Sequence, residues 1–468
     1  MNFRMIPRLA SILFCLIMAS CATYPSKVEK IKSALGNSLH DKHAVYHIYN
    51  TSGANKLLAL QEKGRLAQLK GKYEESAKLY AEAIAFSDAL EDKALFSVGD
   101  ALDKTLAVAY GSDIALDYPV VGFERMMLHV LDAFDRLALG DLDGFGVDVR
   151  NIERCRGMTQ ARMKREMDAL QVKLRKKGYA QYFSEGNEAG KSYQSFMASV
   201  ASLAPGLKNS TDNVYALFLM ALYREWRGDF QEALAYYEEI ETIWPGNPAV
   251  ATGLARCKGE PMQEGCGELV LFFEEGFIPP KRLDHTKVGG MFLTLPNYAV
   301  ADCLPYEDGG PVVVFDGSHY VAITKTLCDL APLAIKAHEE RLRGIIGRKK
   351  LTAGITTAMI TLNNEVNTTF FSNPLYEVAN LCLGFCTAFL ADIMVISSEK
   401  PDLRSWLLLP RQVQVVRLTL KAGQHDMAFA SAGKIVRLSV SIHAGETTIA
   451  HGISIPGTMQ AFSANLSK

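Results

Sequence analysis

The stretch that most constrains the fold is the segment of residues 213–248, whose pattern is that of two packed helices joined by a tight turn. Its apolar residues recur three and four positions apart, which is typical of an amphipathic helix. Gly228 is expected to end the first helix, because glycine adopts the left-handed backbone of a helix terminus without strain. Ala221 is small enough for the two helices to touch, and Ala233 and Tyr237 are expected to pack the second helix. Such a pair buries its apolar face only by stacking on neighbours, so the stretch predicts a layered helical domain.

Residues 56–84 repeat this pattern, with Gly64 at the expected helix crossing, Gly71 at the turn and Tyr80 in the groove. Both stretches resemble tetratricopeptide repeats, which are helix pairs of about 34 residues. Gly140 follows Gly71 by 69 residues, about two repeat lengths, so degenerate helix pairs are expected between the two clear ones. The sequence therefore predicts an N-terminal tetratricopeptide-like superhelix.

The composition changes from about Cys257, where apolar and β-branched runs separated by turns replace the helical pattern. Residues 311–315 and 319–324 flank Asp316-Gly317 and are typical of a hairpin. The other expected strands cover residues 268–273, 413–420, 435–442 and 447–453. Together they predict a β-sandwich-like domain, expected to be antiparallel, with a helical insertion. The expected fold class is α+β.

The expected domain organisation follows from these changes of pattern and from the start of the chain. The expected segments are a signal peptide at 1–20, a lipid-anchored tether and first helix at 21–54, the helical domain at 55–256, and the β-rich domain at 257–468 with its insertion at 332–398.

The first residues have the order of an export signal: Arg4 and Arg8, then an apolar run, then small residues immediately before Cys21. The position of Cys21 resembles a bacterial lipobox, in which the signal is removed and the cysteine is acylated, for example with palmitate. An ordinary cleaved signal with an incidental cysteine is the alternative. Because Ala22 and not an aspartate follows Cys21, we expect an outer-membrane lipoprotein that faces the periplasm.

Charge and cysteine content bear on three properties: nucleic-acid binding, disulfide bridges and zinc sites. Without the signal, 48 Lys and Arg face 51 Asp and Glu, which gives no bulk reason to bind nucleic acid. Exported cysteines can form disulfides, and Cys257 and Cys266 bracket a loop containing Gly and Pro, so they are the expected bridge. No zinc-type cysteine pair occurs.

Few residues suggest chemistry. His40, His43 and His47 would share one helix face and are a weak metal candidate, with an exposed polar face as the alternative. His319 lies beside Asp316, but a catalytic triad is assembled by geometry and cannot be inferred from adjacency. We therefore expect a protein that is not an enzyme and has no cofactor, with a cell-wall hydrolase as a remote alternative.

Two further expected helices have compositions that raise the question of membrane contact. Residues 160–177 form an expected amphipathic helix whose Lys and Arg cluster either contacts anionic lipid or is simply solvated. Residues 375–396 are mostly apolar, but the apolar interior is shorter than the roughly 20 residues that a bilayer span needs. A buried or interface helix is expected there, with a membrane-lying or oligomerising helix as the alternative.

Three segments, residues 118–150, 267–282 and 401–425, carry a resemblance, most specifically through Arg-Ser-Trp and Leu-Pro-Arg between Arg404 and Arg411. The chain resembles a poorly characterised family of bacterial lipoproteins that combine tetratricopeptide-like helices with a C-terminal β domain. The resemblance implies a cell-envelope protein, often encoded beside a lipoprotein that activates penicillin-binding proteins. It brings no catalytic residues.

The sequence thus predicts a lipid-anchored periplasmic scaffold that binds an envelope protein or peptide through its helical repeats. The expected partner-binding residues are Tyr223, Arg224, Tyr237, Arg404 and Trp406. Arg404 and Trp406 could instead pack at the joint between the helical insertion and the β domain. An oligomerising component of an envelope assembly or secretion complex, and hence a homo-oligomer, is the alternative function.

Overall fold

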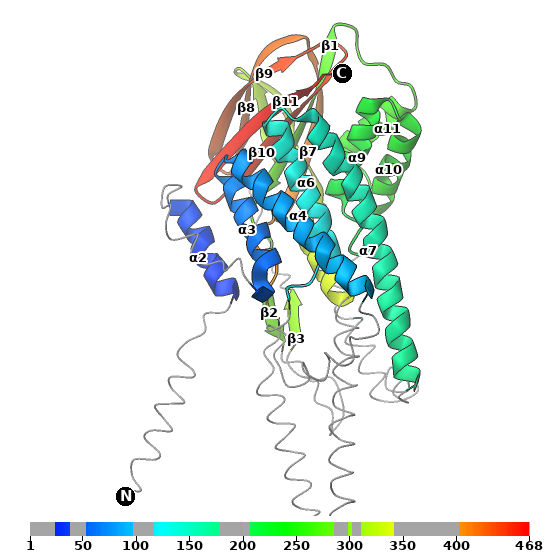
Figure 1. Ribbon diagram of the computed structural model, residues 1–468. Helices are drawn as coiled ribbons and strands as arrows, with labels where there is room; N and C mark the ends of the chain where they lie inside the picture. The colour runs from blue at the N-terminus through cyan, green and yellow to red at the C-terminus, as the bar shows by residue number, and fades with distance from the viewer. Residues whose placement is uncertain are drawn as a thin grey trace, which may run out of the picture.

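The computed structural model describes residues 24–37, 53–96, 117–176, 198, 206–284, 298–301, 310–340 and 402–467. Helices occupy most of the described chain before Cys257, and strands predominate after it (Figure 1). The expected α+β fold class is confirmed. Cys21, His40, His43, His47 and residues 375–396 lie outside the described residues.

The helices form one layer of neighbouring hairpins. Its elements are α2 (Tyr24–Asn37), η1 (Gly53–Asn55), α3 (Lys56–Leu69), α4 (Tyr73–Phe96), α6 (Gly122–Ala138), α7 (Leu142–Lys176), α9 (Val214–Arg227), α10 (Phe230–Ile243) and α11 (Pro248–Cys257). The hairpins α3–α4, α6–α7 and α9–α10 follow one another in chain order (Figure 1). Their turns contain Gly71, Gly140 and Gly228, with φ angles of 69°, 74° and 84°, as the sequence predicts.

Close helix contacts depend on two glycines that face aromatic rings. A Cβ atom on Gly64 would lie 2.6 Å from Cε1 of Tyr80, so α3 and α4 approach more closely than any side chain would allow. In the same way, a Cβ atom on Gly253 of α11 would lie 2.3 Å from Cζ of Tyr237. Ala221, Ala233 and Tyr237 are all fully buried, as expected for this helix pair.

The strands form three sheets. The five-stranded sheet has the order β11-β10-β1-β7-β6, the four-stranded sheet β5-β4-β8-β9, and β2 pairs with β3. The strands are β1 (Cys266–Glu275), β2 (Lys281–Asp284), β3 (Tyr298–Ala301), β4 (Val313–Asp316), β5 (His319–Ile323), β6 (Lys325–Asp329), β7 (Gln412–Lys421), β8 (Gly423–Ser431), β9 (Lys434–Ile442), β10 (Thr447–Ile455) and β11 (Thr458–Leu466). The expected hairpin is β4–β5.

The five-stranded sheet is mixed, so the expected antiparallel arrangement is wrong for one pair. The central strand β1 pairs antiparallel with β7 but parallel with β10. Parallel pairing needs a long connection, and more than 150 residues of chain separate β1 from β10.

Alternation along β1 separates two cores. Leu269, Leu271 and Phe273 pack with the four-stranded sheet, whereas Val270 and Phe272 join the core beneath the helices. The two sheets therefore form a sandwich, and the helices cover the outer face of the five-stranded sheet (Figure 1). The described residues thus form three layers, in the order helices, five-stranded sheet and four-stranded sheet.

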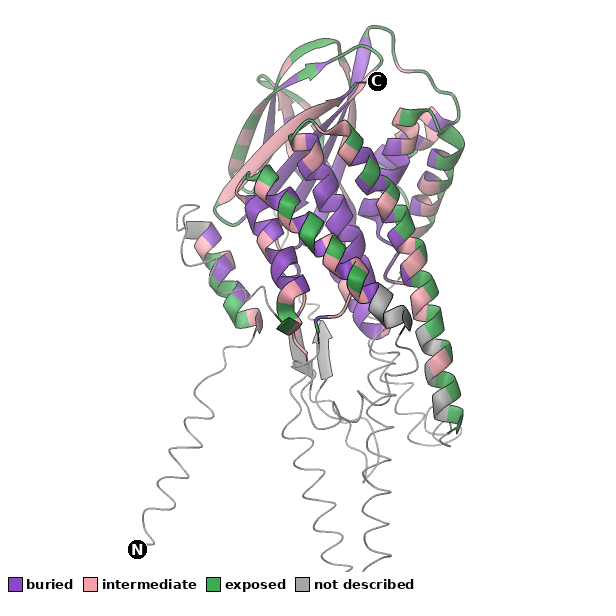
Figure 2. Cartoon of the chain, in the orientation of Figure 1, coloured by how far each residue is buried: buried purple, intermediate pink, exposed green. Residues whose placement is uncertain are grey.

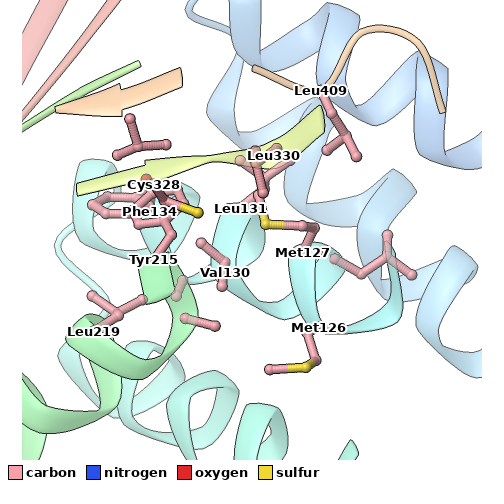
Figure 3. Close-up of a cluster of buried hydrophobic side chains, with 14 of the residues drawn as sticks. Met126, Met127, Val130, Leu131, Phe134, Tyr215, Leu219, Cys328, Leu330 and Leu409 are labelled. Carbon is pink, nitrogen blue, oxygen red and sulfur yellow. The ribbon is translucent and has the colours of Figure 1, made fainter. Parts of the chain in front are cut away.

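The core beneath the helices draws on distant parts of the chain. Figure 3 shows Leu131 and Phe134 of α6 beside Tyr215 and Leu219 of α9, together with the labelled side chains of Cys328, Leu330 and Leu409. A helix that runs from residue 330 to residue 340, where that described range ends, begins the expected insertion, and its Leu330 and Leu333 are buried. The rest of the insertion lies outside the described residues.

Candidate functional site

The inner helices α3, α6 and α9 would line the groove of an open superhelix, but here they lie against the protein's own sheet. Every residue from Gly122 to Asp135 in α6 is buried, and so is every residue from Val214 to Tyr223 in α9 (Figure 2). Phe134 contacts Phe272 of β1 and stacks on His451 of β10 at a centroid distance of 4.1 Å. The groove expected to hold a partner is therefore filled by the five-stranded sheet.

A buried ionic cluster ties these helices to the sheet. Nη2 of Arg65 in α3 lies 2.5 Å from Oε2 of Glu274 in β1, and Tyr215 donates to Oε1 of the same carboxylate at 2.9 Å. His451 Nε2 lies 3.3 Å from Oε1 of Glu274. Burial by itself raises the pKa of Glu274, but the charges of Arg65 and His451 outweigh it and lower the pKa to about 2. This carboxylate is charged and fully engaged.

A second cluster joins α9 and α10 to the same sheet. Arg417 of β7 lies 2.8 Å from Glu225 of α9 and donates to Glu268 of β1 at 3.0 Å. Its Nη1 also donates to the hydroxyl of Tyr237 at 3.1 Å. The Arg417 side chain is 1% exposed, so its charge is balanced entirely by these partners.

The segment from Asp402 to β7 passes between the helices and is held by Glu62 of α3. The backbone amides of Leu407 and Leu408 donate to the Glu62 carboxylate at 2.8 and 3.1 Å, and the hydroxyl of Tyr24 donates at 2.7 Å. Burial raises the pKa of Glu62 to about 7, although these hydrogen bonds oppose that rise. Glu62 therefore connects α2, α3 and the segment before β7.

Arg404 and Trp406 lie in this segment, and the structure places them at a joint and not on a surface. Arg404 donates to Asp402 at 2.8 Å and to Asn55 at 2.8 Å. Trp406 is 1% exposed and packs near Tyr80. Both residues make their contacts within the chain, and that they bind a partner stays a prediction that these contacts do not support.

The other expected partner-binding residues are also mostly internal. Tyr223 is 6% exposed and accepts a hydrogen bond from Arg150 at 2.6 Å, and Tyr237 is fully buried beside Gly253. Arg224 is half-buried and makes ion pairs with Glu153, Asp229 and Glu232. Tyr223 and Tyr237 therefore offer little or no surface to a partner, and Arg224 is the most exposed of the five residues.

The expected disulfide is also wrong, because Cys257 and Cys266 are both free thiols. A bridge needs Cβ atoms about 4 Å apart. Cys257 ends α11 and packs in the helical core, whereas Cys266 begins β1 opposite Lys421. Burial raises the pKa of the Cys257 thiol to about 11, so it is protonated at neutral pH.

The described residues enclose a small cavity. A cavity of about 20 Å³ lies beside Trp406, Ile278 and the first residues of α6, and such a volume holds about one water molecule. No cluster of His, Cys, Asp and Glu with the make-up of a metal site occurs in the described part of the chain. Asp316 of the β4–β5 hairpin pairs with His425 of β8, at 2.6 Å from its Nδ1, and not with His319. The Nε2 atom of His425 lies 2.8 Å from the Lys421 carbonyl.

The outer face of the four-stranded sheet presents an apolar surface to solvent. Ile323, Val313, Ala430 and Ile435 form one row across the four strands. Tyr320, Phe315, Ala428 and Arg437 form the neighbouring row. We call these eight residues the outer apolar face; seven of them are apolar, Arg437 is charged, and Ala428 is only 4% exposed. Tyr320 is 62% exposed, Ile435 61% and Ile323 44%.

Sequence reasoning missed this face. The alternation of apolar residues in β5 and β9 predicts two-sided strands, but only the pairing of all four strands brings the exposed positions together. None of the helices within the described ranges is long and apolar enough to cross a membrane.

Comparisons with known proteins add no relative. No protein-family model matches the chain, and neither curated proteins nor solved structures give a match. The resemblance to tetratricopeptide-containing lipoproteins stays a prediction.

Proposed function

We propose that this chain is a scaffold of the cell envelope, held by a lipid on Cys21 in the outer membrane and facing the periplasm, that binds an envelope protein through the outer apolar face. The observation that carries the proposal is the exposure of Tyr320, Ile323 and Ile435 on one face of one sheet. Monomeric soluble proteins rarely expose contiguous apolar rows of this kind, and such patches usually mark interaction sites.

The partner is expected to present an extended, apolar segment. Among the described strands, β5 lies at the edge of its sheet, and no described strand pairs with the other side of its backbone, where a further strand could add. Apolar side chains on alternate residues of an added strand would continue the rows through Ile323 and Tyr320. Arg437 at the other end of the second row is exposed and favours an acidic residue on the partner.

The proposal differs from a groove-binding scaffold in one testable respect. The helical layer supplies rigidity, since its inner face is buried by the sheet, and partner contact is assigned to the opposite side of the sandwich. A variant at Ala221, which is fully buried, would therefore report on folding and not on binding.

Site-specific photocrosslinking in the cell tests the proposal. A photoreactive residue at Tyr320 or at Ile435 is expected to give an adduct with one and the same envelope protein, and Ile323→Glu is expected to abolish both adducts. Ser439→Glu, on an exposed residue of β9 outside the two rows, is the matched control and is expected to preserve them.

Three outcomes would contradict the proposal. Adducts that survive Ile323→Glu would place the partner elsewhere, and adducts of twice the chain mass would identify a second copy in place of a partner protein. The same adducts from a photoreactive residue at Ala251, an exposed position on α11, would show non-specific capture.

A further inference from the structure

The second half of α7 extends beyond the rest of the helical layer. A Cβ atom on Gly122, the first residue of α6, would lie 2.3 Å from Cγ2 of Thr159 in α7, so these two residues are level with each other. Because α6 and α7 are antiparallel, the seventeen residues of α7 from 160 to 176 continue past the start of α6. At 1.5 Å per residue this overhang is about 25 Å long.

Among the described residues, the tertiary contacts of the overhang lie at its base. Arg162 donates to the Val120 carbonyl at 2.8 Å and lies 3.2 Å from Glu91, and Gln160 donates to Thr211 at 2.8 Å. Farther along, the exposed residues include Lys164, Arg165, Arg175 and Lys176. The sequence from 160 to 176 contains six Lys and Arg against two Asp and Glu. The overhang is therefore a strongly basic rod in a chain whose overall charge is close to neutral.

The N-terminal helix fixes where the lipid would be. Val28, Ile31 and Leu35 of α2 are buried, and Tyr24 bonds Glu62 of α3, so α2 is packed onto the body of the protein. Only Ala22 and Thr23 lie between Cys21 and Tyr24, and this step of three residues along the chain spans about 10 Å at most. A lipid on Cys21 therefore holds the membrane close to the first turn of α2.

The start of α2 and the overhang of α7 lie at the same end of the molecule. In Figure 1, α2 and α3 both begin at the lower end of the helical layer, and α7 passes beyond that end. Tyr118 donates its backbone N–H to the Ala54 carbonyl, which places the chain before α6 beside the start of α3. The basic rod thus points toward the membrane that a lipid on Cys21 would enter.

We propose that the outer part of the overhang of α7, residues 164–176, binds the anionic lipid headgroups of the membrane that holds Cys21. This inference rests on the lipid anchor of the proposed function. Basic side chains close to an anionic surface are attracted within about one Debye length, roughly 8 Å at physiological ionic strength. Together, the lipid and the overhang make two points of attachment, which restrict the tilt of the molecule on the membrane.

Hydrogen exchange of the full lipidated chain in liposomes tests the inference. Peptides covering residues 164–176 are expected to exchange at least about tenfold more slowly in phosphatidylglycerol–phosphatidylcholine vesicles than in phosphatidylcholine vesicles, and 0.5 M salt is expected to remove the difference because it shortens the Debye length to roughly 4 Å. The variant Lys164→Glu/Arg165→Glu/Arg175→Glu/Lys176→Glu is expected to show no slowing. The matched control, Lys258→Glu/Lys421→Glu, changes two exposed lysines near the start of β1 and is expected to behave as the unaltered chain.

Each failure has a distinct meaning. If the mass of the Cys21 peptide shows no lipid, the anchor and this inference both fall. If Cys21 is lipidated and residues 164–176 exchange equally fast in both vesicles, this inference alone falls. Equal slowing in both vesicles, or slowing that survives the fourfold charge reversal, would overturn the assignment to anionic headgroups. Unchanged exchange in α10 reports that each variant is folded.

Discussion

Glu62 and Glu274 are both fully buried at the joint between helices and sheet, yet their pKa values shift in opposite directions. Glu274 has a guanidinium and an imidazole as neighbours, and its pKa falls to about 2. The closest partners of Glu62 are neutral, namely two backbone amides and a phenol, and its pKa rises to about 7. Neutral hydrogen-bond donors do not offset the cost of removing a charge from water, whereas a buried cation does.

The raised pKa of Glu62 predicts a pH-dependent contribution to stability. Because its folded-state pKa lies above the ordinary value of 4.5, folding takes up a proton between these two values. The contribution is fully present below about pH 4.5 and is lost as the pH rises through about 7. The free energy of unfolding of the unaltered chain, compared with that of Glu62→Gln, is therefore expected to fall by on the order of 3 kcal/mol from pH 4.5 to pH 8.

Denaturant unfolding at a series of pH values provides the measurement. The comparison with Glu62→Gln cancels the other titrating groups, because the variant keeps them all. A difference between the two proteins that stays constant over this pH range would show that Glu62 has an ordinary pKa.

Arg65 is the residue whose loss is expected to cost most at this joint. Arg65→Met leaves the Glu274 carboxylate, whose side chain is 0% exposed, without its main counter-charge. The expected loss in the free energy of unfolding is about 3–5 kcal/mol. Arg65→Met/Glu274→Gln is expected to recover part of it, because no unpaired charge is then buried. Arg437→Met, at an exposed arginine, is the control and is expected to change stability by less than about 0.5 kcal/mol. A double variant no more stable than Arg65→Met would argue against an unpaired charge as the cause.

Among the elements, the α3–α4 hairpin was predictable because its spacing is local. The small residue at the helix crossing, the glycine at the turn and the aromatic residue in the groove all lie within one stretch of about 30 residues. The strands β8 and β11 were not predicted, because their sequences mix polar and apolar residues and gain their strand character from the neighbours they pair with. The full length of α7 was also missed, since only its second half was recognised as a helix.

Substitution by alanine is expected to change stability in opposite directions at two helical glycines, Gly64 in α3 and Gly157 in α7. Gly64→Ala is expected to destabilise the chain by about 1–3 kcal/mol, because its Cβ overlaps the buried ring of Tyr80. Gly157→Ala in α7 is expected to stabilise it by about 0.5–1 kcal/mol, because nothing lies within 4 Å of that Cβ and alanine favours the helix. Thermal unfolding of both variants gives the comparison. Similar shifts in both would mean that helix propensity, and not the contact with Tyr80, decides.

At the scale of the whole molecule, the helices and the five-stranded sheet share one core. The shared core argues against a β-rich domain that begins at residue 257 and folds on its own. Val270 and Phe272 of β1 belong to the same buried cluster as α3, α6 and α9. The isolated segment of residues 257–468 would expose these side chains and leave Glu274 without Arg65. We expect this segment to be insoluble or unfolded by circular dichroism, and the chain from residue 22 to unfold in a single transition. A soluble, cooperatively folding segment would instead support an independent β-rich domain.

The sequence by itself determined the elements whose causes are local: the helical hairpins with their glycine turns, most of the long strands and the α+β class. It could not determine what the helical layer faces, because that depends on side chains far apart in the chain, such as Arg65 and Glu274. The tertiary structure alone decided that Arg404 and Trp406 are internal and that Tyr320, Ile323 and Ile435 meet on one exposed surface. The physical reason is that burial is a property of the assembled layers, and a residue type such as Trp or Arg serves equally well in a joint or in an interface.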